Sequence, residues 1–144
     1  MLYSEVNGDL FSAGSEYFLV HCISSDFAMG AGIAKEFTAR GVKRYLQENY
    51  LPSWNGVGYA IIAPLLGFQG VYNLVTKGQY WHKPTIDTLY QALYCVKQRV
   101  KKGDKLAMPK IGCGLDRLSW CDVKKCIDEL FGEMDIEIKV FSLS

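Results

Sequence analysis

The sequence predicts a single α/β domain in which helices cover both faces of a central mixed sheet. Apolar segments of strand length alternate with segments of helical periodicity, in the order β-β-α-α-β-β-α-β-α-β. Strands mixed with helices in this way pack as a three-layer α/β/α sandwich. The length of 144 residues suits one domain, residues 1–144, with a full core. We therefore expect one domain with a six-stranded mixed sheet.

The first two strands are predicted from apolar runs bounded by a turn signal. Tyr3–Val6 is expected to be a strand because Asn7-Gly8-Asp9 signals a turn directly after it. Tyr17–Cys22 is a continuous apolar run, which is typical of a central strand covered on both faces. His21 lies inside this run, and we interpret it as a hydrogen-bonded core residue rather than a ligand.

Two helices are expected after the second strand. A glycine-rich segment, residues 23–32, leaves the strand and opens a helix that runs to about Arg40. A further helix is predicted at 42–49, ending before Pro52, because a residue that precedes proline is driven out of the helical conformation.

The middle of the chain predicts two strands and one helix. The strands Gly56–Pro64 and Val71–Val75 flank a turn at Gly67–Gly70. Thr85 and Asp87 are suited to open a helix that runs to about Lys101. Apolar residues at helical spacing predict its buried stripe: Leu89, Ala92, Leu93, Val96 and Val100.

The last elements are the strand Lys105–Met108, the helix Cys121–Phe131 and the strand Ile136–Leu143. Within this helix, the residues expected to point inward are Val123, Ile127 and Leu130. The closing strand alternates apolar and polar residues, as a half-buried strand does.

Composition and charge bound the partners and the compartment. With a net charge of +1, no bulk electrostatic field argues for nucleic acid or an anionic membrane. No signal peptide is visible, and the longest apolar stretch, residues 57–68, is too short and too glycine-broken to span a bilayer. Five scattered cysteines favour a reducing compartment over a disulfide framework. We expect a cytoplasmic protein, or a nuclear one in a eukaryote, with no membrane partner.

Three loops are expected at the carboxyl ends of the strands, where such sheets bind ligands. They are Ile23–Gly32, Thr76–His82 and Ile111–Asp116. Two of them are rich in glycine and precede a helix, which favours close approach of an anion to the backbone. The other brings Lys77. The combination suits a phosphorylated, sugar-bearing nucleotide, and no metal-ligand pattern or cofactor is indicated.

The common nucleotide motifs fit poorly. Gly30-Ala31-Gly32 starts like the dinucleotide fingerprint, but Lys35 stands where the third glycine belongs. The loop at Gly112 fails the same test at Arg117. These departures argue against a Rossmann NAD site, and the absent Walker pattern argues against an ATPase.

At this point the sequence resembles the macrodomain family, most of all the branch of the terminal ADP-ribose protein glycohydrolase. The resemblance covers nearly the whole chain. It is carried by Gly8–Phe11, His21–Ser24, Met29–Ala34, Thr76–Lys77 with His82–Thr85, and Met108–Leu118. It implies a macrodomain-like three-layer sandwich.

The resemblance also implies roles for individual residues. Lys77 matches the nucleophilic lysine of the branch and Asp116 its catalytic aspartate. Asp9 and Leu10 are expected at the adenine. Ser24, Gly30, Ala31, Gly32, Ile33 and Ala34 are expected along the distal ribose and diphosphate, Gly112, Cys113, Gly114 and Leu115 around the diphosphate through their backbone N–H groups, and Thr76, Ile111 and Leu143 as further substrate contacts.

The implied chemistry agrees with the residue types. The anomeric carbon of a ribose ester can open to an aldehyde, which a deprotonated lysine attacks to form a Schiff base. Asp116 then acts as acid and base. The competing interpretations are that Lys77 is a solvated loop residue and that Asp116 caps the following helix.

The expected function is an ADP-ribosyl hydrolase that removes terminal ADP-ribose from carboxylate esters or modified nucleobases. Such a role connects it with deacylation, reversal of ADP-ribosylation and DNA damage. Its partners would be ADP-ribose and ADP-ribosylated protein or nucleic acid, and we expect a monomer. The alternatives are a phosphatase of ADP-ribose 1″-phosphate and a non-catalytic reader of ADP-ribose, which needs neither Lys77 nor Asp116.

Overall fold

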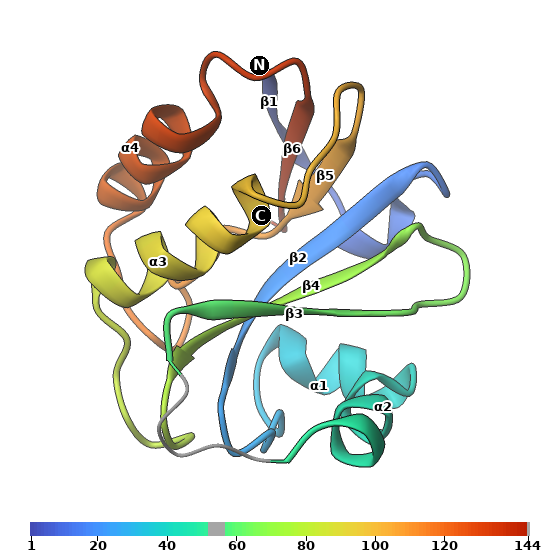
Figure 1. Cartoon of the computed structure of the whole chain (residues 1–144), viewed down its shortest axis with the longest axis vertical. Coiled ribbons are helices and arrows are strands. Elements are labelled where there is room, and N and C mark those ends of the chain that lie inside the picture. Colours follow the sequence, from blue (N-terminus) through green and yellow to red (C-terminus); the bar gives the residue numbers. More distant parts are fainter. Residues whose placement is uncertain (52–56, 144) are drawn as a thin grey trace.

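The sheet of the computed structural model, which describes residues 1–51 and 57–143, has six strands in the order β1-β6-β5-β2-β4-β3 (Figure 1). The strands are β1 (Leu2–Asn7), β2 (Tyr17–Ser24), β3 (Tyr59–Ala63), β4 (Gly70–Lys77), β5 (Lys105–Met108) and β6 (Glu137–Ser142). All neighbours pair in parallel except β3 and β4. The predicted mixed six-stranded sheet is confirmed.

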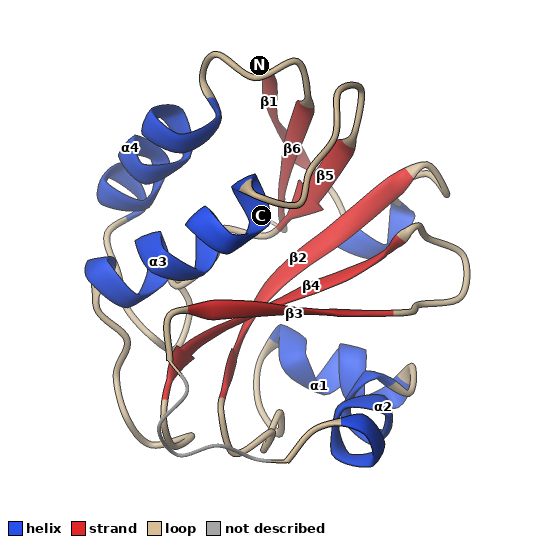
Figure 2. Ribbon diagram, viewed as in Figure 1, coloured by secondary structure: helices blue, strands red, loops and turns tan. Residues whose placement is uncertain are grey.

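Helices cover both faces of this sheet, as Figure 2 shows. The helices are α1 (Ile33–Ala39), α2 (Val42–Asn49), α3 (Ile86–Lys97) and α4 (Trp120–Phe131), with a short 3₁₀ helix, η1 (Leu10–Ser12). The helices α3 and α4 pack together on one face, and α1 and α2 lie on the other. The predicted three-layer sandwich is therefore confirmed.

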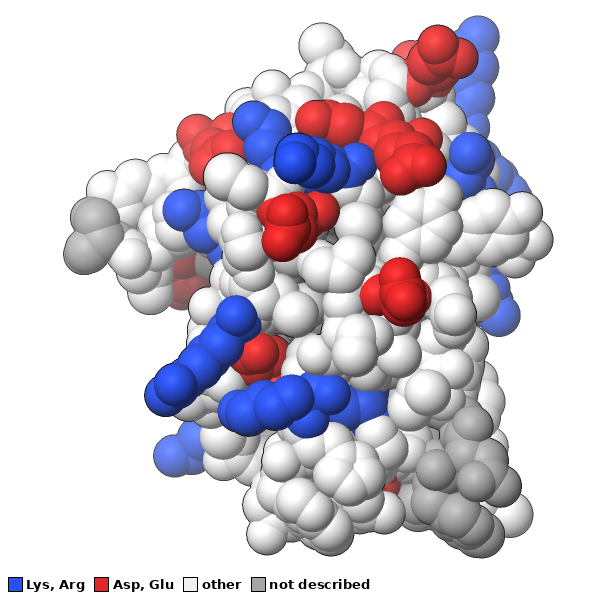
Figure 3. All heavy atoms as spheres, turned by 90° about the vertical axis from the view of Figure 1, so that its left-hand side faces the viewer, with Lys and Arg blue, Asp and Glu red and all other residues white. Residues whose placement is uncertain are grey.

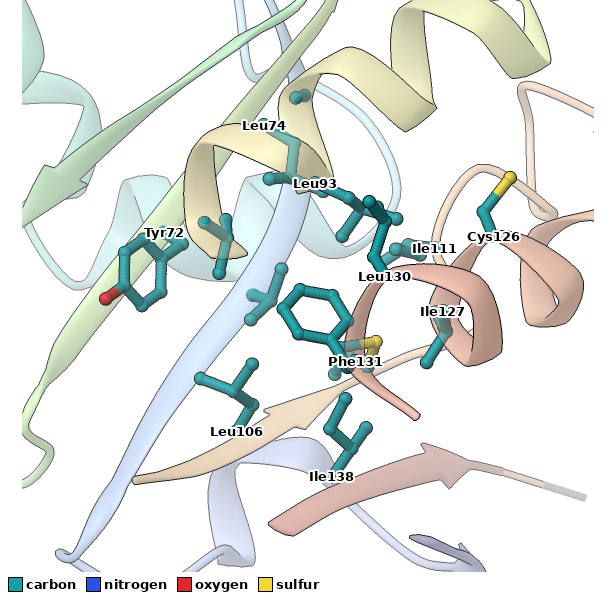
Figure 4. Close-up of a cluster of buried hydrophobic side chains, with 14 of the residues drawn as sticks. Tyr72, Leu74, Leu93, Leu106, Ile111, Cys126, Ile127, Leu130, Phe131 and Ile138 are labelled. Atoms are coloured by element: carbon teal, nitrogen blue, oxygen red, sulfur yellow. The ribbon is translucent and has the colours of Figure 1, made fainter. Parts of the chain in front are cut away.

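The core consists of two apolar clusters, one on each face. The cluster beneath α3 and α4 includes Leu93, Phe131 and Ile138, as Figure 4 shows. Ile111 belongs to this cluster and is 2% exposed. Because Ile111 lies in the loop after β5, its burial anchors that loop to the core. On the opposite face, Phe37 of α1 and Leu46 of α2 are fully buried.

Most predicted boundaries agree with the structure only to within one or two residues, and two differences concern α3 and β4. The helix that was expected to run to about Lys101 ends at Lys97, because the chain tightens there into a turn with a bond from Arg99 N to the Val96 carbonyl. The strand predicted at Val71–Val75 instead continues to Lys77. The predicted start of β3 at Gly56 lies outside the described residues.

The sheet topology explains where functional loops gather. Five parallel strands direct all their carboxyl ends to one edge of the sheet. The strand β2 pairs with both β4 and β5, so the loops that follow these strands are adjacent. The ends of β1 and β6 lie side by side at the same edge. All the predicted site residues except those within α1 therefore come from one edge.

Acidic and basic side chains are mixed on one face of the molecule. On the face drawn in Figure 3, acidic side chains gather mainly in the upper half, whereas basic side chains lie in both halves. Among the helices that the structure describes, none is both long and apolar enough to cross a membrane.

Candidate active site

A cavity of about 740 Å³ opens where the loops after β2, β4 and β5 meet. This volume falls in the range of small-molecule sites. Residues of all three predicted loops line it: Ser24, Gly30, Ala31, Gly32, Ile33, Ala34, Lys77, Ile111, Gly112, Gly114, Leu115 and Asp116. The structure thus brings together three segments that are far apart in sequence.

A second, smaller hollow of about 330 Å³ adjoins this cavity. Asp9, Leu10, Cys113 and Leu143 line it, and Gly114 lines both hollows. The Asp9 carboxylate accepts a bond from the Phe11 N–H at 3.0 Å and so caps η1. The two hollows form a single elongated site along the carboxyl edge of the sheet.

Lys77 and Asp116 form an ion pair at one end of the cavity. The Nζ atom of Lys77 lies 2.7 Å from Oδ1 of Asp116, and the side chains are only 14% and 16% exposed. Lys77 comes from the end of β4, and Asp116 comes from the loop after β5. Lys77 is therefore not a solvated loop residue. Nor does Asp116 cap the next helix, because α4 begins after Ser119.

Asp26 ties the loop that follows Lys77 to the end of β2. Its carboxylate accepts bonds from the N–H groups of Ala28 and Tyr80, each at 3.0 Å. The Ser24 hydroxyl also donates to it. Burial acts to raise the pKa of Asp26, but these hydrogen bonds outweigh burial and lower it. Asp26 is thereby kept ionised as a fixed acceptor.

Ser25 makes a second connection between the end of β2 and the segment around Lys77. Its hydroxyl donates to the Gly78 carbonyl at 2.7 Å, and its N–H donates to the Lys77 carbonyl at 2.9 Å. Both bonds continue the pairing of β2 with β4 beyond the strands. The backbone of Lys77 is consequently held from its neighbouring strand.

Two further contacts join the loop after β5 to its neighbours. Lys83 donates from Nζ to the Leu115 carbonyl at 3.0 Å. If residue 32 were not a glycine, its Cβ would lie 3.7 Å from Cδ1 of Leu115. The loops after β2 and β5 therefore approach each other closely. Leu115 is nevertheless 65% exposed. It lies at the edge of the cavity rather than in its floor.

The loops that line the cavity hold strained backbone conformations. Phe27, Met29 and Arg117 have φ angles of 55°, 46° and 61°, a region that residues other than glycine rarely adopt. The side chains of Phe27 and Met29 are buried in the core. Core packing therefore fixes the shape of the loop after β2 against this strain.

Two predicted substrate contacts differ in their surroundings from the other predicted site residues. Thr76 is 1% exposed and is not among the residues that line the cavity, because the alternation of β4 directs its side chain to the face opposite that of Lys77. The Cys113 N–H donates to the Lys110 carbonyl at 3.2 Å, and its thiol faces the Ile111 carbonyl. These bonds shape the loop after β5, while Cys113 also lines the smaller hollow. Both residues stay predictions as substrate contacts.

Burial keeps the other reactive groups near the site neutral. Cys22 lines the cavity, and burial, aided by the negative charge of Asp116, raises its pKa to about 12. His21 is fully buried, stacks on Phe37 and bonds through Nε2 to Asn73 at 2.6 Å. Burial lowers the pKa of His21 to about 4. The prediction of a hydrogen-bonded core histidine is confirmed.

Sequence reasoning missed several residues that line the cavity. They include Tyr80, Lys83 and Lys110. Each lies in or directly beside a loop that was predicted to bind the ligand, but no local sequence pattern distinguishes its side chain from the neighbouring ones. Within residues 1–51 and 57–143, no group of three or more His, Cys, Asp or Glu is placed to hold a metal ion.

Comparison with known proteins gives close relatives over almost the full chain. The chain is 40% identical to the ADP-ribose glycohydrolase OARD1 of Bos taurus over 142 residues, which cover 96% of this chain and 90% of the relative. It is 39% identical to the ADP-ribose glycohydrolase OARD1 of Homo sapiens, with the same coverage. No family profile matches the sequence.

Solved structures share the fold at lower identity. The macrodomain of Thermus aquaticus DarG has a TM-score of 0.76 at 23% identity and covers 98% of both chains. The macrodomain of Mycobacterium tuberculosis DarG has a TM-score of 0.78 at 22% identity and covers 99% of both. Thermosipho africanus DarTG in complex with ADP-ribose has a TM-score of 0.80 at 20% identity, covering 97% of this chain and 41% of the other.

Proposed function

This chain belongs to the ADP-ribose glycohydrolase family and has the macrodomain fold, and we propose from this membership that it binds ADP-ribose and hydrolytically removes terminal ADP-ribose from a modified substrate. The observation that carries the proposal is the contact of 2.7 Å between Lys77 and Asp116 at the cavity wall. A protein that only reads ADP-ribose has no need of such a pair.

The elongated site matches the shape of ADP-ribose. We place the adenine in the smaller hollow, beside Asp9, Leu10 and Leu143. The diphosphate then lies at Gly114, which lines both hollows, and the distal ribose reaches Lys77 and Asp116 in the larger cavity. In this placement the backbone of Gly32 and Gly114 can approach the diphosphate without obstruction by a side chain.

The reaction we propose proceeds through a covalent adduct on Lys77. Asp116 accepts a proton from the Lys77 ammonium group, to which it is already hydrogen-bonded. The free amine attacks C1″ of the distal ribose, and the bond from C1″ to the leaving group breaks. The leaving group departs with the electron pair and takes a proton from Asp116.

Water completes the cycle. The sugar ring of the adduct opens to an imine between Nζ and C1″, with a proton passing to the ring oxygen. Addition of water to the imine and expulsion of the amine regenerate Lys77 and release ADP-ribose, with Asp116 transferring the protons. One water is consumed for each bond that is broken. The short distance between the two side chains serves proton transfer at both stages.

We propose ADP-ribose esters of protein carboxylates, O-acyl-ADP-ribose and ADP-ribosylated nucleobases as the substrates. Activity on the protein esters and on O-acyl-ADP-ribose would make the protein a deacylase, and activity on ADP-ribosylated nucleobases would connect it with DNA damage. Esters of a protein carboxylate and nucleobase adducts that are attached through C1″ place their scissile bond where Lys77 and Asp116 would act, and the same holds for O-acyl-ADP-ribose when the acyl group is on the 1″ oxygen. We propose a cytoplasmic monomer, which agrees with the five free cysteines, since reducing compartments preserve thiols.

A direct experiment separates the proposed hydrolase from a reader or a phosphatase. The purified protein is incubated with a peptide bearing ADP-ribose esterified to glutamate, with ADP-ribose 1″-phosphate, and with ADP-ribose alone. We expect release of ADP-ribose from the peptide and loss of that release in Lys77→Ala. Binding without release contradicts the hydrolase, and phosphate release without peptide hydrolysis favours the phosphatase.

A further inference from the structure

We propose that Tyr80 and Trp81 form a wall against which the leaving group of the substrate stacks, so that the enzyme prefers a nucleobase of single-stranded nucleic acid to an aliphatic carboxylate. The inference rests on the proposed function, because it concerns the group that leaves C1″ in the same site. It assigns specificity to two aromatic residues of the predicted loop Thr76–His82, to which the sequence analysis gives no role.

One of the two rings lines the same cavity as the catalytic pair, and the other packs against it. Tyr80 lines the cavity together with Lys77 and Asp116. Its ring meets that of Trp81 edge to face, with centroids 5.1 Å apart and an interplanar angle of 87°. The rings therefore form a corner with one flat face on each side, and one side of this corner lines the cavity in which the scissile bond would lie.

The exposure of these rings is not explained by packing. Each side chain is 63% exposed, and neither belongs to the two apolar clusters that the structure describes. Tyrosine and tryptophan offer large contact areas when they are covered. Single exposed apolar side chains are common on protein surfaces, but here two large rings are adjacent and one of them, Tyr80, lines the cavity.

The wall is held in place before any ligand arrives. Asp26 accepts a bond from the Tyr80 N–H at 3.0 Å. The Gln79 N–H donates to Nδ1 of His82 at 3.1 Å, and the His82 N–H donates to the Gln79 carbonyl at 2.9 Å. These bonds close a tight turn around the two rings. A contact surface that is already ordered loses less entropy on binding.

The chemistry of the corner favours a nucleobase. Every base has a flat face that stacks on aromatic side chains with little dependence on sequence, whereas the aliphatic stem of glutamate offers no such face. Lys83 lines the same cavity and supplies a positive charge for a strand phosphate. Since the net charge is only +1, we expect local stacking to dominate recognition of the strand.

The test compares two substrates that share ADP-ribose and differ only in the leaving group. One is a single-stranded oligodeoxynucleotide with ADP-ribose on one base, and the other is a peptide with ADP-ribose esterified to glutamate. The specificity ratio is kcat/KM for the oligonucleotide divided by kcat/KM for the peptide. Replacing both Tyr80 and Trp81 with alanine should lower this ratio about 10-fold or more.

Two sets of controls accompany this variant. Tyr80→Phe and Trp81→Phe keep aromatic faces and should retain most of the ratio. Tyr94→Ala removes an exposed ring, 46% exposed, from α3 outside the cavity and should leave kcat/KM for both substrates unchanged. Circular dichroism confirms that each variant is folded.

Each outcome decides between the two levels of the proposal. An unchanged ratio in the folded double variant contradicts the stacking wall, as does an equal loss on both substrates, which would assign the rings to loop structure. Wild-type protein that hydrolyses the peptide and not the oligonucleotide contradicts the stacking wall alone. Wild-type protein that hydrolyses neither contradicts the proposed function itself.

Discussion

The Nζ atom of Lys77 lies 2.7 Å from Oδ1 of Asp116, although 39 residues separate them in the sequence. The two side chains are 14% and 16% exposed, so solvent screens their attraction less than that of a surface pair. The pair exists because β4 and β5 flank β2 in parallel and end at the same edge. Topology, rather than local sequence, creates this site.

The loop around Gly114 offers a test of where the ligand lies. A side chain on Gly114 would meet no atom within 4 Å, and its φ angle lies outside the region reserved for glycine. Gly114→Val should therefore fold with an unchanged melting temperature but lose affinity for ADP-ribose about 10-fold or more, because the branched side chain enters the shared wall of the two hollows. Calorimetry measures the affinity.

Gly114→Ala provides a graded control for this variant. Its single methyl group should cost less affinity than the valine side chain does. Equal affinity for ADP-ribose in the wild type, Gly114→Ala and Gly114→Val would remove this loop from the binding site.

Asp26 offers a test of how the loop after Lys77 is positioned. Its two oxygens accept separate bonds from Ala28 and Tyr80. Asp26→Asn can keep the oxygen that faces Ala28 but turns an NH₂ group toward the Tyr80 N–H. We expect a loss of about 1 to 3 kcal/mol in the free energy of unfolding, measured in urea, and a larger fall in kcat than in affinity for ADP-ribose.

Asp26→Ala removes both acceptors and should destabilise the protein further. If turnover in both variants matched the wild type, Asp26 would serve stability alone.

His21 predicts a specific dependence of stability on pH. Burial lowers its pKa to about 4 in the folded protein, against about 6.5 when unfolded. Between these values the unfolded chain binds a proton that the folded protein does not. The free energy of unfolding should therefore fall as the pH drops from about 6.5 to about 4, by up to about 3 kcal/mol from this residue.

His21→Gln isolates that contribution, because glutamine does not titrate. Urea unfolding of both proteins across this pH range gives the difference in slope. Parallel curves for the wild type and His21→Gln would show that His21 takes up its proton equally in both states.

The raised pKa of Cys22 predicts that the thiols of this protein differ in reactivity. Burial raises the pKa of Cys22 to about 12, so little thiolate forms at the cavity wall. Cys121 on α4 is exposed. Iodoacetamide at pH 8 should therefore label Cys121 well before Cys22, as peptide mapping by mass spectrometry would show. Rapid labelling of Cys22 would mean that the cavity wall opens readily or that the thiol is activated.

The sequence predicted the order and type of the elements because period and turn signals are local. The apolar run at Tyr17–Cys22 and the stripe from Leu89 to Val96 fall in β2 and α3 as expected. The early end of α3 was missed because the stripe continues to Val100, while the chain leaves the helix to reach β5. Helix ends depend on the next element as much as on propensity.

The site could be predicted only in part, because local sequence signals do not show how distant segments pack together. Glycine spacing and the resemblance identified segments, but burial decides which side chains face a ligand. Thr76 belongs to a recognised motif and yet points away from the cavity, whereas Tyr80 and Lys83 line it. The clamp formed by Asp26 joins residues 54 positions apart, which no local pattern reveals.

The central claim is that Lys77 and Asp116 act at successive steps of one covalent reaction. Lys77→Ala should bind ADP-ribose but not release it from an ADP-ribosylated glutamate peptide, because the nucleophile is absent. In Asp116→Ala, solvent can still accept the proton of the Lys77 ammonium group before attack, but no side chain is left to transfer protons during release. Lys83→Ala is a control that removes a cation from the same cavity and keeps the pair.

The most direct measurement is intact-protein mass spectrometry of Asp116→Ala after incubation with the peptide and borohydride reduction, followed by mapping of the modified residue. We expect an ADP-ribose adduct that accumulates on Lys77 in this variant and is absent from Lys77→Ala. Near-normal hydrolysis by Lys77→Ala would contradict the covalent mechanism, and the site would then be one in which Asp116 activates water.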